Sequence, residues 1–194
     1  MCFFAFKRPS SRANWSQAMG SMGGATERLE KQLDTVTTRE AAVLVRPTEE
    51  QSPTQTRAEI ERALTGMDRT QFRFDVTVDD TGYGWAIVKG AVLGDVAAGI
   101  SQMGDVLTAS GLGDRVMAAV FPFMWRDSVH QRERKIYWLY QPRVRGFTPF
   151  VPAGDPTREE RDHELEIRME TAIRRDLPTF RDTSEWYPIW GMPI

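Results

Sequence analysis

The chain has 194 residues, of which 41% are hydrophobic and 27% charged, which is the composition of a globular protein with one core of ordinary size. Its formal net charge of -2 excludes a global attraction to nucleic acid or to an anionic membrane. Cys2 is the only cysteine, which excludes an intrachain disulfide and a multi-cysteine metal site, and no apolar run reaches the roughly 20 residues that span a bilayer. We expect a cytoplasmic protein.

The N-terminal third carries the weakest pattern. Residues 1–25 mix Ser, Gly, Ala and Met, which is typical of a flexible arm. Residues 26–36 place three apolar side chains on one stripe and predict a helix. The apolar run at 39–45 fits either a helix or a strand, and the polar, proline-bearing stretch at 46–55 predicts a linker.

A helix and a hairpin follow. Thr56 and Glu59 have the spacing of a capping box, and Gly66 stands where a short helix would end. Residues 72–78 alternate strictly between apolar and polar side chains, and a turn-rich "DDTG" separates them from a second run at 83–90. These two runs predict a β-hairpin with one buried face.

The second half has the clearest periodicity. Apolar positions at helical spacing predict a helix over 93–110, which Gly111 ends in a Schellman motif. Three β-rich runs at 116–125, 135–141 and 146–151 predict strands, and the prolines within the first and last of them indicate an edge, a bulge or an end of pairing.

A final helix after "DPTREE" completes the order α-β-β-α-β-β-β-α. This order predicts an α+β fold, with a mainly antiparallel sheet of about five strands and helices packed on one face. We expect residues 26–194 to form this single domain, including an aromatic C-terminal tail.

Residues with catalytic potential are scattered. His130 and His163 lack the HExxH spacing of a zinc site, and no nucleophile elbow or phosphate-binding loop is present. The carboxylates of the last helical segment alternate with arginines, as on a solvated helix face. They are Glu159, Glu160, Glu164 and Glu166. We therefore predict a protein with no catalytic, cofactor-binding or metal-binding residues that is not an enzyme.

A mixed cluster of cations and aromatic residues spans positions 126–145. Its candidate residues are Arg132, Arg134, Lys135, Trp138, Arg143 and Arg145. Such a mixture is found in grooves that bind single-stranded nucleic acid. Strand alternation, with cations in water and aromatics in the core, accounts for it better, so we expect no nucleic-acid partner and keep single-strand binding as an alternative.

The first residues, "MCFFAFKR", combine aromatic side chains with cations. Phe3, Phe4 and Phe6 could enter a membrane surface while Lys7 and Arg8 meet anionic lipid. An ordinary unstructured start has equal weight. If the contact exists, it places the protein peripherally at the inner face of the membrane.

The chain ends in "EWYPIWGMPI", which concentrates aromatic surface in Trp186, Tyr187 and Trp190. Side chains of this size, left in water together, would form a larger apolar patch than soluble monomers usually expose. We expect Trp186 and Trp190 to dock on their own helix and sheet layers as a structural clasp. Binding of a partner by the tail is the alternative.

Several stretches together resemble a known family. They are "YGWAIVKG", "LGDVAAGISQMGDVLTASGLGDRVMAAVFPF", "KIYWLYQPRVRGFTPFVPAG", "HELEIRMETAIRRDLPTF" and "EWYPIWGMPI". From about Phe72 to the C-terminus, the chain is similar to the phage-shock-protein-A-associated protein B family. The closing "WYPIWG" with the "ELEIRM" segment before it is the most specific part.

The resemblance implies an accessory protein of the phage-shock envelope-stress response that engages a coiled-coil membrane-remodelling partner of the phage shock protein A type. It supplies no catalytic residues and no cofactor. The order of helices and strands is also similar to that of small chaperone-like modules that dimerise, so we expect a homodimer. A small enzyme with a cleft of arginine and carboxylate groups remains the competing hypothesis.

Overall fold

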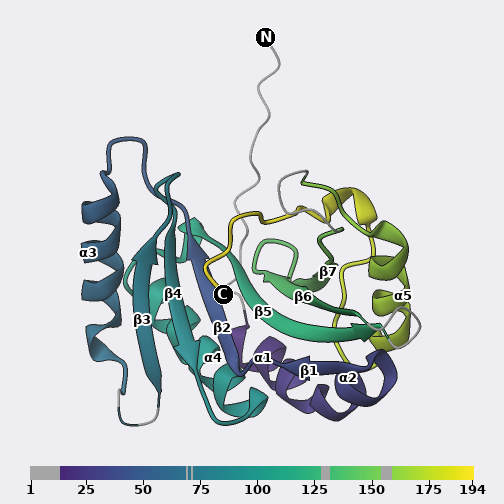
Figure 1. The fold of residues 1–194 in the computed structure, drawn as a ribbon. Helices are drawn as coiled ribbons and strands as arrows, with labels where there is room; N and C mark the ends of the chain where they lie inside the picture. Colours follow the sequence, from purple (N-terminus) through teal and green to yellow (C-terminus); the bar gives the residue numbers. More distant parts are fainter. Residues whose placement is uncertain (1–13, 69, 71, 128–131, 154–158) are drawn as a thin grey trace.

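The computed structural model describes residues 14–68, 70, 72–127, 132–153 and 159–194. In this part of the chain, a seven-stranded antiparallel sheet packs its helices on one face (Figure 1). The predicted α+β class is confirmed, and the sheet has two strands more than the predicted five.

The strands are β1 (Thr35–Thr37), β2 (Glu40–Val45), β3 (Arg73–Val78), β4 (Gly84–Lys89), β5 (Val116–Asp127), β6 (Arg132–Gln141) and β7 (Gly146–Phe150). The α-helices are α1 (Trp15–Gly24), α2 (Thr26–Leu33), α3 (Pro53–Ala63), α4 (Leu93–Ala109) and α5 (His163–Ile173). The 3₁₀ turns are η1 (Leu64–Gly66), η2 (Gly113–Arg115) and η3 (Thr183–Glu185).

Strand order in the sheet is β3-β4-β2-β5-β6-β7, with β1 also paired to β5. β2 lies in the middle, and its residues from Ala41 to Val45 are all buried. A strand buried on both faces loses the alternation that identifies a half-exposed strand, which explains why the run at 39–45 was ambiguous in the sequence.

The two prolines occupy positions where no ladder hydrogen bond is lost. Pro122 lies on β5 between its pairing with β1, which reaches Phe123, and its pairing with β2, which begins at Val120. Pro149 lies on β7, the last strand of the order, so its nitrogen needs no strand partner on the outer side.

The flexible arm predicted for residues 1–25 is wrong for its second half, because residues 15–24 form α1. Trp15, Ala18, Met19 and Met22 are buried on one side of that helix at i, i+3, i+4 and i+7. Asn14 caps it by accepting a hydrogen bond from the Gln17 backbone. The glycine and serine residues between these four positions gave the segment the composition of a flexible arm, so its apolar helical stripe was overlooked.

Two further boundaries differ from the predictions. α2 ends at Leu33, because Asp34 takes a left-handed conformation and the chain turns into β1 before Val36. α3 begins earlier than expected, with the capping box formed by Ser52 and Gln55.

The elements with strong periodicity are confirmed. β3 and β4 form the predicted hairpin, and α4 is the helix predicted over 93–110. At the end of α4, Gly111 has φ of 85° and the Leu112 backbone N–H donates to the Leu107 carbonyl at 2.9 Å, which is the predicted Schellman motif.

The sheet buries apolar side chains on both faces. On the helix face, α1 to α5 cover the larger part of the core, which includes Phe121, Trp138 and Phe147. On the opposite face, a second cluster includes Trp85 and Phe150. Within the described part of the chain no helix covers this second face, and the C-terminal tail crosses it instead (Figure 1).

Candidate functional site

The C-terminal tail packs on the open face of its own sheet. Trp186 is 4% exposed and Ile194 is 6% exposed. The half-buried Trp190 meets the ring of Phe150 edge to face, with ring centroids 4.8 Å apart. Tyr187, in contrast, is 52% exposed. The two residues expected to dock as a clasp, Trp186 and Trp190, therefore lie against their own domain.

Backbone and side-chain hydrogen bonds anchor the start of the tail. The Phe147 N–H of β7 donates to the Pro178 carbonyl at 2.8 Å, and the Phe180 N–H donates to the Phe147 carbonyl at 2.9 Å. The indole N–H of Trp186 then donates to the Phe180 carbonyl at 2.6 Å. These bonds cover the outer edge of β7 and fix where the tail leaves it.

A buried ion pair joins the tail to α5. Glu166 is fully buried and receives two hydrogen bonds from the Arg161 guanidinium, at 3.1 and 2.9 Å. Glu166 also accepts a hydrogen bond from the Val151 backbone at 2.9 Å, and Arg161 donates to the Trp186 carbonyl. The prediction that Glu166 lies on a solvated helix face is therefore wrong.

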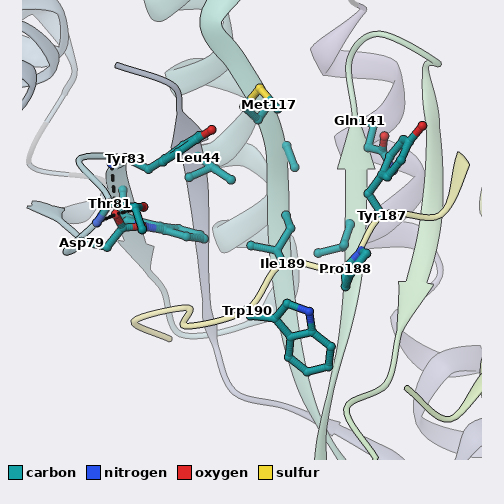
Figure 2. A pocket seen from close by; sticks show the side chains of 13 residues that line it. Leu44, Asp79, Thr81, Tyr83, Met117, Gln141, Tyr187, Pro188, Ile189 and Trp190 are labelled. Carbon is teal, nitrogen blue, oxygen red and sulfur yellow. Dashed lines mark hydrogen bonds between the residues drawn. The ribbon is translucent and has the colours of Figure 1, made fainter. Parts of the chain in front are cut away.

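The first concave surface lies between the tail and the open face of the sheet. We call it the tail pocket; its volume is about 300 Å³. Figure 2 shows Tyr83 and Leu44 on one side of it and Tyr187, Ile189 and Trp190 of the tail on the other. Its lining residues are Leu44, Asp79, Thr81, Tyr83, Trp85, Met117, Ala118, Leu139, Gln141, Tyr187, Pro188, Ile189 and Trp190.

Asp79 occupies one end of the tail pocket, in the turn between β3 and β4 (Figure 2). Its Oδ1 accepts hydrogen bonds from the Thr81 backbone and hydroxyl and from the Tyr83 backbone. Its Oδ2 accepts the indole N–H of Trp85 at 2.8 Å. Burial acts to raise the pKa of Asp79, but these hydrogen bonds outweigh it and the pKa lies below its usual range.

The second concave surface lies between α2, α5 and the adjoining ends of β5 and β6. We call it the α2–α5 groove; its volume is about 750 Å³. Its apolar lining includes Leu33, Trp125 and Ile167, and Ile167 is 52% exposed. Its charged lining residues are Asp34, Arg126, Asp127, Arg134, Asp162, Glu164 and Arg168.

The arginine and carboxylate groups of this groove bear on the enzyme hypothesis. Arg134 donates to Asp162 at 2.8 Å, and its guanidinium lies over the Trp125 ring at 5.0 Å. Asp162 also caps α5 by accepting a hydrogen bond from the Leu165 backbone. Arg134 and Asp162 therefore stabilise the N-terminal end of α5 through these contacts.

The structure does not bring the basic and aromatic residues of 126–145 together. Arg132, Arg134 and Lys135 lie at the start of β6, whereas Arg143 and Arg145 lie in the turn after its other end. Trp138 is buried in the helix-side core, so it offers no stacking surface. Arg143 pairs with Glu185 at 2.5 Å.

Other predicted residues have simpler outcomes. Phe3, Phe4, Phe6, Lys7 and Arg8, proposed for membrane contact, lie outside the described residues, as does His130. His163 is 67% exposed at its side chain, with its Nδ1 3.1 Å from Glu166. Among the described residues, no helix is long and apolar enough to cross a membrane, and no three potential metal ligands lie close enough to hold an ion.

The fold and its surfaces define an α+β protein that covers the second face of its sheet with its own C-terminal tail and presents two grooves. The chain belongs to the PspA associated protein B family, whose model matches residues 5–194. The match confirms the resemblance and extends it upstream of Phe72 over nearly the whole chain. No curated protein and no solved structure matches the chain. Family membership identifies an accessory protein linked to PspA.

Proposed function

We propose that the protein is a non-enzymatic accessory module of the phage-shock envelope-stress response that binds a helix of a coiled-coil, membrane-remodelling partner of the phage shock protein A type. The protein acts in the cytoplasm, as a homodimer, with weak peripheral contact at the inner face of the membrane. Family membership supports the link to PspA. The α2–α5 groove is the observation that carries helix binding.

Ile167 supplies the apolar anchor in this groove. It lies on the outward side of α5 and is 52% exposed, whereas Leu165 and Met169 lie on the inward side of the helix and are buried. With the half-buried Leu33 and Trp125 it forms an apolar strip. An amphipathic helix lays its apolar stripe on such a strip.

Charges of both signs flank this strip. Arg126 and Arg168 carry positive charge, whereas Asp34 and Glu164 carry negative charge, and all four are exposed. A helix from a coiled coil carries acidic and basic residues beside its apolar seam, and those residues set partner choice and orientation. The mixed charges of the groove suit that pattern better than they suit a polyanion.

The test is a binding measurement between the full chain and the partner purified from the same host. Ile167→Glu places a charge in the apolar strip, and we expect about a tenfold loss of affinity or more, as for a truncated interface anchor. Val92→Glu is the matched control, because Val92 is 57% exposed and does not line the groove. Equal affinity of both variants would remove the groove from the proposal, and no binding by the unmodified chain would remove the partner.

A further inference from the structure

The tail pocket has a chemical character of its own. Its walls include the aromatic side chains of Tyr83, Trp85, Tyr187 and Trp190. Asp79 is the one charged residue among those that line it. An apolar, aromatic pocket with a single carboxylate and no cation is complementary to a positive charge carried on an apolar stem.

The carboxylate of Asp79 is preorganised for such a charge. Its lowered pKa keeps it ionised at neutral pH. Its four hydrogen bonds come from neutral donors, and it takes part in no ion pair among the described residues. A half-buried carboxylate with its charge uncompensated favours a cationic ligand.

The arrangement of these hydrogen bonds selects the shape of the cation. Oδ1 already accepts three donors, whereas Oδ2 accepts only the Trp85 indole N–H. A carboxylate oxygen has two lone pairs, so the three donors on Oδ1 share its lone pairs and saturate it, whereas one acceptor position remains on Oδ2. Arginine binds carboxylates best through two parallel hydrogen bonds, which this geometry does not allow, whereas an ammonium needs one.

We propose that the tail pocket binds a lysine side chain presented by a protein segment. The ammonium pairs with Asp79 Oδ2, and the four-carbon stem lies against the apolar walls, which include Met117 and Leu139. Met117 is 43% exposed and Tyr187 is 52% exposed, so both still have apolar surface that a bound stem can cover. The aromatic rings add cation–π attraction.

The tail pocket and the α2–α5 groove share no lining residue, so this proposal stands or falls independently of helix binding. The test is an NMR titration of the full ¹⁵N-labelled chain with lysine blocked at both backbone termini. The indole N–H signals of Trp85 and Trp190 are the reporters. We expect both to shift, with a dissociation constant of about 10 mM or weaker, because one side chain forms few contacts.

Three blocked amino acids are the controls for ligand chemistry. Nε-acetyl-lysine removes the charge, norleucine retains the stem alone, and arginine keeps the charge in a planar group. We expect each of them to shift the two indole signals at least threefold less at equal concentration. Equal shifts with norleucine would overturn the electrostatic part of the proposal, equal shifts with arginine would overturn the selection by Oδ2, and no shift with lysine would overturn the site.

Two variants connect the binding to the pocket. Asp79→Asn should reduce the affinity for blocked lysine about tenfold, because it removes the charge at similar volume. Tyr187→Ala removes an exposed wall residue that the fold does not bury, and it should weaken binding about threefold without changing the rest of the spectrum. The Tyr187 variant keeps the test decisive if Asp79→Asn disturbs the turn. Unchanged binding in Tyr187→Ala would refute the assignment.

Discussion

Removing the C-terminal tail should destabilise the whole protein. A chain truncated after Asp182 loses the buried Trp186, and it loses Trp190 and Ile194, which pack on the open face of the sheet. It also leaves the guanidinium of Arg161 without the Trp186 carbonyl. The apolar sheet face under the tail is then exposed to water.

The size of the effect follows from burial. Trp186 is 4% exposed, and deleting a buried tryptophan side chain costs about 3–5 kcal/mol. The loss of Trp190 and Ile194 adds to this value. For a domain of this length each kcal/mol lowers Tm by about 2–4 °C, so Trp186 alone corresponds to a fall of about 6–20 °C.

Thermal unfolding followed by circular dichroism measures this shift, with the intact chain and Tyr187→Ala run in parallel. Because Tyr187 is 52% exposed, its substitution should change stability by less than about 0.5 kcal/mol. A truncated chain that melts with the intact one, yet no longer binds the partner, would show that the tail is a binding segment and not a clasp.

Arg161→Leu should lower the free energy of unfolding by about 3–5 kcal/mol, because it leaves the buried Glu166 carboxylate uncompensated. Denaturant unfolding measures this loss, and the double variant with Glu166→Gln should be more stable than Arg161→Leu alone. Gly104→Ala should lower Tm and change the tryptophan emission spectrum, since an added Cβ would lie 2.2 Å from the Trp15 ring; an unchanged melt would mean that α1 can move aside. Deleting residues 1–12 should reduce co-sedimentation with anionic vesicles, each cation there contributing about 1 kcal/mol, and equal pelleting of both chains would end the membrane role.

Local patterns predicted most of the fold from Phe72 onward. The hairpin of β3 and β4, helix α4 with its Gly111 stop, and strands β5 to β7 all rest on periodicity that a short window contains. α1 was missed, although Trp15, Ala18, Met19 and Met22 have helical spacing, because its glycines and serines suggested disorder. The composition of this segment indicated disorder, whereas its apolar spacing indicated a helix. The structure shows the helix, which packs against α4.

The candidate sites were harder to predict, because they depend on contacts between distant segments. Trp186 and Trp190 were identified from their size alone, whereas the tail pocket also needs Asp79, more than a hundred positions upstream. Glu166 could not be distinguished from its exposed neighbour Glu164 by spacing. Only the hydrogen bonds from Arg161 and from the Val151 N–H to Glu166, which form in the folded chain, show which of the two carboxylates is buried.

The tail explains why this protein has a pocket on its sheet at all. A sheet with helices on one face needs a second layer over its other apolar face. Here an extended segment containing Pro188 supplies that layer, and it is narrower than a helix, so Met117 and the tail pocket stay accessible. Besides its bonds to β7, the tail is held through α5, where Glu166 points inward to Arg161 while the adjacent Ile167 points outward into the α2–α5 groove. One helix thus holds the tail with its inner side and lines the proposed partner site with its outer side, so substitutions at Arg161 act on the clasp and substitutions at Ile167 act on the groove.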